Sequence, residues 1–263
     1  MYQIHFDTPI HVHFIGIGGI SMSGLAEILL SEGFTVSGSD NKRSPLTEAL
    51  TGKGALIRYG QRRDNITDDI DLVVYTSAIH PDNPEFLAMQ EKGLPSLTRA
   101  ELLGQMMRQY KTSVAISGTH GKTTTTAMIS DILLQEGADP TISIGGILKS
   151  IGGNYRVGGS DYFVTEACEY TNSFLSFFPK VGIILNVQED HLDFFRDLAD
   201  IRNSFHAFAG LLPPDGCLII NGEIENYEEL TQGLSCPVVT FGMREAFDYY
   251  PGEISDDNPA KPA

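Results

Sequence analysis

Lys122 and Thr123 lie in a short glycine-containing segment, and their side chains are of types that can bind phosphate and Mg²⁺. They close the segment 117–123, Ser-Gly-Thr-His-Gly-Lys-Thr, which follows the apolar run 114–116 and leads into a helical pattern over 123–135. A glycine turn between a strand and a helix directs backbone N–H groups and the positive helix N-terminus toward an anion. A lysine in such a turn reaches β- and γ-phosphate oxygens, and a threonine hydroxyl ligates Mg²⁺. The segment therefore predicts a nucleotide-phosphate site.

This turn is shorter than the common phosphate-binding loop, which has four residues between its glycines. Here Thr119 and His120 alone separate Gly118 from Gly121. His120 could bond a substrate phosphate or carboxylate, or it could brace the loop, and its position favours neither. The residues expected to contact the nucleotide are Gly118, Thr119, His120, Gly121, Lys122, Thr123 and Thr124.

A second glycine-rich turn, Gly-Ile-Gly-Gly-Ile-Ser at 16–21, follows a predicted strand at 11–15 and opens another helical pattern. The next strand, 34–38, leads to Asp40 about 20 residues after the turn, as in a βαβ unit that binds a phosphate. The dinucleotide fingerprint is weak, because Ser21 takes the third glycine position. We expect a diphosphate on the helix N-terminus, with Asp40 free to bond a ribose or base edge. A purely structural turn and an NAD site are the alternatives.

Two more candidates follow predicted strands of the second half. Glu166 ends the strand 162–165, where a carboxylate could hold Mg²⁺ beside Thr123 or could simply be a solvated acid. His191 follows the strand 181–185. Because Mg²⁺ prefers oxygen ligands, spacing alone favours a structural histidine at 191.

The alternation of strands and helices along the chain indicates parallel, doubly wound sheets. Further strand patterns lie at 55–57, 72–76, 114–116, 218–220 and 238–241, and helical patterns at 46–50, 84–92, 97–108 and 198–212. A glycine-rich connection is expected around 145–153. We predict an α/β protein with a Rossmann-like domain at 1–110 and a P-loop-type α/β domain at 111–263. Ser77 and its neighbours up to His80 line the crevice of the first domain or form a plain loop, with Asn83 capping the next helix.

Composition excludes several classes of protein. A net charge of −16 argues against nucleic acid as a partner, so a phosphate site must be local. No apolar run approaches the ~18 residues of a membrane helix, and the N-terminus lacks a secretory signal. The three cysteines, at 168, 217 and 236, have no metal-binding spacing. We expect free thiols in a reducing, cytoplasmic setting, without membrane insertion.

The motifs together resemble the Mur ligase family, ATP-dependent enzymes that extend the peptidoglycan stem peptide. The family's short loop, Gly-Thr-x-Gly-Lys-Thr, matches residues 118–123, including the two-residue gap. Four other segments support the resemblance: 16–26, 37–40, 76–79 together with 83–85, and 190–193. The matching segments and their surroundings run from about residue 11 to about residue 245, which is nearly the whole chain.

The resemblance implies roles that spacing does not give. It places UDP-N-acetylmuramic acid on the first domain, with the uridine near Asp40. The other residues implied in that substrate site are Gly18, Gly19, Ile20, Ser21 and Ser77. Lys122 would contact the γ-phosphate of ATP, Thr123 and Glu166 one Mg²⁺, and His191 a second Mg²⁺, which reverses the interpretation of His191 from spacing. Lys122, Glu166 and His191 are thus the implied catalytic residues.

The implied reaction activates the muramoyl carboxylate as an acyl phosphate, which the amine of L-alanine then attacks. Murein peptide ligases share the loop and are one alternative. A non-catalytic UDP-sugar or nucleotide-binding module is another, and an unrelated P-loop or dinucleotide enzyme is a third. The family has three domains in about 450 residues. Because this sequence has 263, we expect a fragment or a truncated paralogue that does not ligate by itself.

Overall fold

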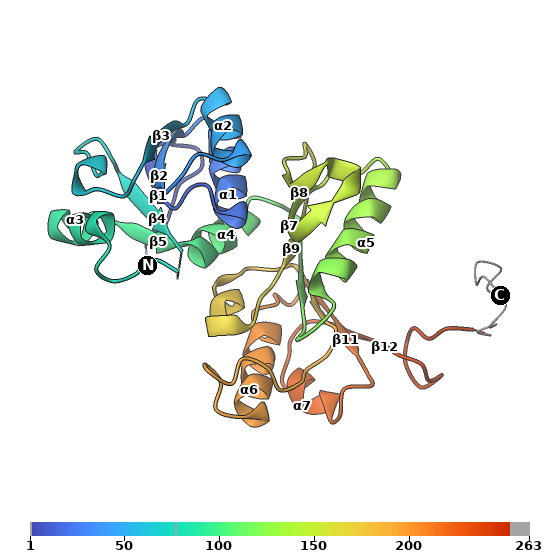
Figure 1. Ribbon diagram of the computed structural model, residues 1–263. Helices are drawn as coiled ribbons and strands as arrows, with labels where there is room; N and C mark the ends of the chain where they lie inside the picture. The colour runs from blue at the N-terminus through green and yellow to red at the C-terminus, as the bar shows by residue number, and fades with distance from the viewer. Residues whose placement is uncertain (1, 77, 253–263) are drawn as a thin grey trace, which may run out of the picture.

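The first half of the molecule is a parallel sheet with helices packed against it (Figure 1). The computed structural model describes residues 2–76 and 78–252. The strands run in the order β3-β2-β1-β4-β5, and every pairing is parallel. Their bounds are β1 His11–Ile15, β2 Thr35–Asp40, β3 Leu56–Tyr59, β4 Leu72–Tyr75 and β5 Ser96–Thr98. Chain order reverses between β1 and β4, so the crevice beyond their carboxyl ends is the expected ligand site.

The helices of this half are α1 Ile20–Ser31, α2 Pro45–Gly52, α3 Pro84–Lys92 and α4 Arg99–Met107, with a short 3₁₀ turn, η1, at Arg63–Asn65. Three of these four helices, α2, α3 and α4, begin at a residue whose side chain accepts from their first N–H groups, whereas α1 has no side-chain cap in the described residues. Asn83 caps α3 as predicted, since its side chain accepts from the amides of Glu85 and Phe86. The predicted helix 97–108 divides instead into the end of β5 and α4, because Thr98 forms a capping box with Glu101.

The second half is a seven-stranded mixed sheet in the order β12-β11-β10-β6-β9-β7-β8. The strands are β6 Thr112–Ser117, β7 Thr141–Leu148, β8 Gly153–Arg156, β9 Tyr162–Glu166, β10 Val181–Ile184, β11 Cys217–Asn221 and β12 Val238–Phe241. All pairings are parallel except β7 with β8. The two sheets confirm the predicted α/β fold class. The glycine-rich connection expected around 145–153 is in fact this antiparallel hairpin, with a short 3₁₀ turn, η2, at Lys149–Ile151.

Helices also pack against the second sheet. They are α5 Lys122–Gln135, α6 Leu198–Ala209 and α7 Tyr227–Thr231, and a 3₁₀ segment, η3, covers Tyr170–Ser176. The apolar side of α6 packs on Phe174, whose ring stacks on Phe208 at 4.8 Å and meets Phe205 edge-on at 5.5 Å. The helix predicted to reach Leu212 ends at Ala209, and Gly210 caps it.

The two halves touch through glycines that admit a close neighbour. A Cβ at Gly24 of α1 would lie 2.5 Å from the ring of Tyr155 on β8, and one at Gly104 of α4 would lie 1.9 Å from the carbonyl oxygen of Ser176. Only glycine fits at such distances. Figure 1 shows α1 and α4 on the side of the first sheet that faces the second. Within the described ranges, no helix has the length and apolar character needed to cross a membrane.

Candidate functional site

The predicted phosphate turn joins β6 to α5 in a shape that needs glycine. Gly118 has φ +140° and Gly121 has φ +85°, both in the region that L-residues with side chains avoid. A Cβ at Gly118 would also stand 3.0 Å from the Cβ of Leu185. The turn therefore lies close against the residues that follow β10, and the N-terminus of α5 has no side-chain cap. Unpaired N–H groups at a helix start are suited to an anion.

Asn186, just after β10, braces this turn. Its Oδ1 accepts from the amide of His120 at 2.8 Å, and its Nδ2 donates to the carbonyl of His120 at 2.9 Å. Its own carbonyl accepts from the amide of Thr119 at 3.2 Å. The backbone of His120 is thus fixed, while its side chain is exposed. Asn186 directly follows the predicted strand 181–185, and the sequence alone gave no sign of this role.

Lys122 points back across the turn toward a buried acid. Its Nζ donates to the Oε2 of Glu169 at 2.9 Å and to Oε1 at 3.2 Å. It also donates to the carbonyl oxygens of Gly118, at 2.5 Å, and Thr119, at 3.2 Å. The side chain of Glu169 is only 2% exposed. A buried carboxylate needs such a partner, so the pair fixes the ammonium group beside the turn.

Glu169 is a second candidate site residue, besides Asn186, that was not identified from the sequence. The signal was a second acid three residues after Glu166, in the run Glu-Ala-Cys-Glu that leaves β9. Nothing in that spacing indicates which of the two acids faces Lys122, because the lysine lies 47 residues earlier in the chain.

Glu166 and Thr123 lie on neighbouring parts of the same edge. The Oε1 of Glu166 accepts from the amide of Gly145 on β7 at 2.6 Å, and a Cβ at Gly145 would stand 2.9 Å from Oε2. The methyl group of Thr123 lies 3.1 Å from where a Cβ of Gly146 would be. The two glycines of β7 thus leave space for both side chains. The contribution of β7 to the site is therefore the pair Gly145–Gly146, which has no side chains that would fill this space.

His191 comes to the same place from the loop after β10. Its Nε2 lies 3.9 Å from the Oε1 of Glu169, and its ring packs on Tyr170 with centroids 4.5 Å apart. The hydroxyl of Tyr170 donates to Asp193 at 2.7 Å. The backbone of His191 has φ +53°, a strained conformation for a residue with a side chain. Strain of this kind clusters at functional sites.

The donor atoms here suit a particular kind of metal site. Among residues 2–76 and 78–252, no group of three or more His, Cys, Asp or Glu side chains is arranged to hold a metal. The Thr123 hydroxyl makes no hydrogen bond within that part of the chain, Thr123 is exposed, and Glu166 bonds the glycine that precedes Gly146, the neighbour of Thr123. Mg²⁺ is held in proteins by few oxygen ligands, with phosphate and water completing its shell. The residues therefore fit Mg²⁺ brought with a nucleotide, and not a complete protein cage.

The first glycine turn has a different electrostatic character. Gly16 has φ +82°, and the amides of Gly16 and Ile17 both donate to the carbonyl of Ser39 at 2.9 Å. The amide of Gly18 donates to the Oδ2 of Asp40 at 2.8 Å. Asp40, expected to be free, thus bonds the turn, and one of the predicted diphosphate amides already has an acceptor.

The remaining residues of this turn lie at the start of α1. Gly19 is the N-cap and provides no side-chain cap, Ile20 is 53% exposed, and Ser21 is partly buried. The Nδ2 of Asn154 on β8 donates to the carbonyl of Ile20 at 3.3 Å, so the second half of the molecule touches this turn. Ser77, also predicted in this site, lies outside the described residues.

A buried acid on α3 supports the strand beneath the first turn. Glu85 is fully buried and accepts from the hydroxyl of Ser39 at 2.5 Å and from the amide side chain of Asn65. The Nε2 of His13 stands 3.9 Å away. Burial raises the pKa of Glu85, but the interactions with His13, Ser39 and Asn65 outweigh it, so the pKa falls below 4.5. Glu85 is therefore a charged anchor for β2.

Comparisons with known proteins agree with this arrangement of two sheets. Residues 11–111 match the family model described as Mur ligase family, catalytic domain, and residues 116–259 match that of the Mur ligase middle domain. The UDP-N-acetylmuramate–L-alanine ligase of Lachnospira eligens is 66% identical over 95% of this chain and 54% of its own length. The ligase of the same name from Agathobacter rectalis is 61% identical over 99% of this chain and 57% of its own. The chain spans about half the length of the curated relatives it matches.

Solved structures give the same result. A UDP-N-acetylmuramate-alanine ligase from Thermotoga maritima superposes with a TM-score of 0.75 at 34% identity, over 89% of this chain and 52% of that one. The UDP-N-acetylmuramate:L-alanyl-gamma-D-glutamyl-meso-diaminopimelate ligase from Neisseria meningitides superposes with a TM-score of 0.81 at 30% identity. That comparison covers 89% of this chain and 78% of the Neisseria chain.

Proposed function

We propose that this chain, which belongs to the Mur ligase family, provides the substrate and ATP-phosphate sites of a ligase that joins L-alanine to UDP-N-acetylmuramic acid. The observation that carries the proposal is Lys122, held at the uncapped start of α5 by turn carbonyls and the buried Glu169. Relatives named for this activity match 95–99% of the chain at 61–66% identity. We propose residues 1–110 as the UDP-substrate domain and residues 111–263 as the ATP-binding domain.

The turn at 118–124 would bind the phosphates of ATP. Backbone amides at the start of α5 would accept the phosphate oxygens, and the Lys122 ammonium would neutralise the γ-phosphate. Glu169 keeps that ammonium beside the turn before a nucleotide arrives. Mg²⁺ would bridge phosphate oxygens while bound by Thr123 and Glu166, and His191 would face a second ion. The protein side of this site thus supplies position and charge.

The chemistry that follows is acyl activation. The carboxylate of the sugar acid would attack the γ-phosphate and release ADP. The amine of L-alanine would then attack the acyl carbon, form the amide and displace inorganic phosphate, with loss of a proton. Each step gathers negative charge on oxygens near the turn, and fixed cations and amides stabilise such charge in a transition state. Lys122 is the one protein cation that touches the turn carbonyls in the described residues.

The first glycine turn would hold the UDP end of the substrate. Gly18 and Gly19 precede α1, which begins at Ile20, and they lie at the crevice where chain order reverses, the usual ligand position in such sheets. Ser21 and Ser77 are proposed at the edge of the same site. Asp40 would exchange its bond with the Gly18 amide for contacts with the uridine, which frees that amide for the diphosphate.

Murein peptide ligase activity is the second candidate, because the Neisseria structure superposes with the higher TM-score of the two compared above. We favour L-alanine as the amino acid because relatives so named reach 61–66% identity, against 30% for the Neisseria protein. The three cysteines are free thiols, which suits the reducing cytoplasm where we propose the protein acts.

Calorimetry of the 263-residue chain tests the binding part of the proposal. We expect UDP-N-acetylmuramic acid to bind and Mg-ATP to bind more weakly, since only about half of the relatives' length is present. If the chain, shown by circular dichroism to be folded, responded to neither ligand, the proposal would be wrong. Binding of NAD without binding of the UDP sugar would favour a dinucleotide enzyme.

Ligation is tested in a chimera of full family length, made by joining this chain to the C-terminal half of the Lachnospira eligens relative. In that chimera Lys122→Ala should lower ligation more than about 1,000-fold, because transition-state charge loses its cation. Binding of the UDP sugar should stay unchanged. Ligation at the rate of the unmutated chimera would contradict the role of Lys122.

A further inference from the structure

A cavity of about 350 Å³ lies where the two halves of the molecule meet. Thr98 and Arg99, at the end of β5 and the start of α4, line one side. Cys168, Tyr170 and Asn172, from the segment that leaves β9, line the other. The carboxyl ends of strands from both sheets thus open into one space, the position in which open parallel sheets bind ligands.

Arg99 is the cation of this cavity, and it has no partner in the described residues. No hydrogen bond or ion pair to its guanidinium occurs within residues 2–76 and 78–252. The acid in the same wall, Glu101, already accepts from the amide and hydroxyl of Thr98 at 2.7 and 2.9 Å. Burial lowers the pKa of Arg99, an effect that nearby Cys168 opposes. Burial thus removes water from the guanidinium group, and no carboxylate of the described residues pairs with it.

A partly buried cation without a counterion is unfavourable in free energy, and an anion of matching shape relieves it. Guanidinium presents parallel N–H donors that match the two oxygens of a carboxylate or of a phosphate. The cavity therefore calls for an anionic group on a ligand that enters between the two sheets.

The opposite wall of the cavity is continuous with the proposed reaction site. Cys168 and Tyr170 flank Glu169, which binds Lys122 at 2.9 Å. The ring of Tyr170 also packs on His191. A group held by Arg99 would therefore lie beside the segment that positions Lys122 and His191.

We infer that Arg99 binds the carboxylate of the UDP-linked sugar acid and holds it toward the phosphate turn. The inference rests on the proposed function and adds to it a binding residue, contributed by the first half of the molecule to chemistry on the second. The carboxylate is the anion we choose, because ATP phosphates are already met by Lys122 and the amides at the start of α5.

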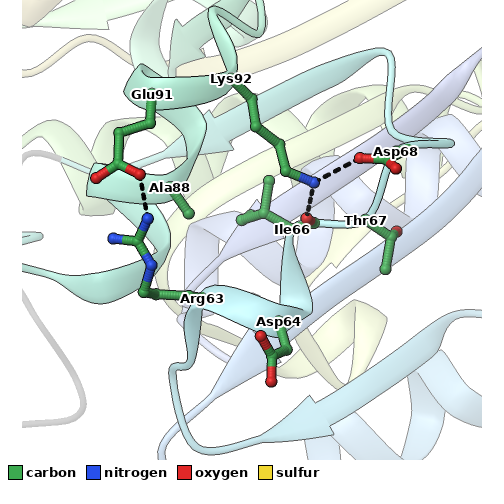
Figure 2. A pocket seen from close by; sticks show the side chains of 8 residues that line it. All are labelled: Arg63, Asp64, Ile66, Thr67, Asp68, Ala88, Glu91 and Lys92. Carbon is green, nitrogen blue, oxygen red and sulfur yellow. Dashed lines mark hydrogen bonds and ion pairs between the residues drawn. The ribbon is translucent and has the colours of Figure 1, made fainter.

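A second hollow serves as a comparison, because its cationic side chains already have partners. It has a volume of about 480 Å³ and lies between η1 and α3, as Figure 2 shows. There Arg63 pairs with Glu91, and Lys92 donates to Asp68 at 2.7 Å and to the carbonyl of Ile66 at 2.6 Å. Its cations are already neutralised, so this hollow gives no reason to expect an anion.

The test compares two UDP sugars by calorimetry on the 263-residue chain. UDP-N-acetylmuramic acid has the carboxylate, and UDP-N-acetylglucosamine lacks it. Arg99→Gln should weaken binding of the first about 30-fold, the loss expected for a charge-assisted pair, and leave binding of the second unchanged. Arg99→Lys keeps the charge but loses the fork, so it should weaken the first about 5-fold. Arg63→Gln is the matched control and should change neither.

The outcomes separate the inference from the proposed function. If the unmutated chain did not bind UDP-N-acetylmuramic acid, the proposed function would fail first. If the unmutated chain bound it and both Arg99 variants bound it equally well, the inference alone would be overturned. Equal losses for the two sugars would also overturn it, because Arg99 would then act on the diphosphate or on folding.

Discussion

The two glycine turns of this molecule share a backbone plan and differ in charge. Each joins a central parallel strand to a helix that starts without a side-chain cap, at 16–21 and at 118–122. The second turn holds Lys122, which is bound to the buried Glu169. The first turn holds an acid instead, since the amide of Gly18 is bonded to Asp40.

The difference shows that a glycine turn alone indicates only where an anion can sit. What is done to the anion depends on the side chains that the fold brings to the turn. At the second turn, Lys122 binds Glu169 from the segment after β9, and His191 from the loop after β10 lies 3.9 Å from Glu169. Glu166 ends β9, which pairs with the strand before the turn. The first turn has amides and an acid, which suit holding a diphosphate and a ribose. We therefore propose that the first turn holds the UDP-linked substrate and that the chemistry takes place at the second turn.

The largest expected effect on stability concerns the Lys122–Glu169 ion pair at the second turn, which has no counterpart among the described residues of the first turn. Lys122→Met should lower the free energy of unfolding of the second half by about 3 kcal/mol, because it leaves the Glu169 carboxylate buried and unpaired. Urea unfolding, followed by hydrogen exchange in β6 and β9, measures the change.

Lys111→Met is the control, since Lys111 pairs with Asp161 on the exposed surface close to the same strand. It should have little effect, because exposed pairs contribute little. A Lys122 variant as stable as the Lys111 variant would show that Glu169 does not depend on this lysine.

The next effect concerns the acid below the first turn and depends on pH. The pKa of Glu85 is lowered in the folded state, so its contribution is present above pH 4.5 and is lost as the pH falls through the folded-state pKa. Glu85→Gln should lower stability by about 2 kcal/mol at pH 7, as for a buried charged hydrogen-bond acceptor. The gap to the unmutated chain should narrow below pH 4.5. Thermal unfolding between pH 3 and pH 7 measures it.

Glu91→Gln on the same helix is exposed and serves as its control, with a small effect expected across this range. A gap for Glu85→Gln that stayed constant from pH 7 to pH 3 would mean that the charge of Glu85 is not what stabilises β2.

The smallest expected effect tests the first turn as a holding site. A Cβ at Gly18 would stand 2.7 Å from the Oδ2 of Asp40. Gly18→Ala should therefore displace Asp40 and weaken the binding of UDP-N-acetylmuramic acid about 10-fold. Mg-ATP binding should not change. Calorimetry measures both, with Gly52→Ala as control because nothing lies near its Cβ position. Weakened Mg-ATP binding in the Gly18 variant would contradict the division between the turns.

Much of the fold could be predicted because its signals are local. Apolar runs and the turns after them located β1, β4, β6, β9 and β10 within a residue or two. The β7–β8 hairpin escaped because the pair Gly145–Gly146 interrupts the alternation that marks a strand. A side chain at either glycine would collide with Glu166 or Thr123, which pack against β7.

The site was predicted as far as its parts are local in the chain. The glycines, Lys122 and Thr123 lie in one short segment, whereas Glu169 and Asn186 reach it from 47 and 66 residues away. Asp40 was expected to be free because its hydrogen-bond donor, the amide of Gly18, lies 22 residues earlier and cannot be identified from the residues around Asp40. These contacts follow from strand order, which only the folded sheet supplies. The roles predicted for Glu166 and His191 stay predictions.

Hydrogen–deuterium exchange of the 263-residue chain tests the division between the turns most directly. UDP-N-acetylmuramic acid should slow exchange of the amides at 16–21, and millimolar Mg-ATP should slow exchange at 118–124. Each ligand should leave the other turn nearly unchanged. The account would be contradicted if Mg-ATP protected 16–21, or if the UDP sugar protected 118–124 and left 16–21 as in the free chain.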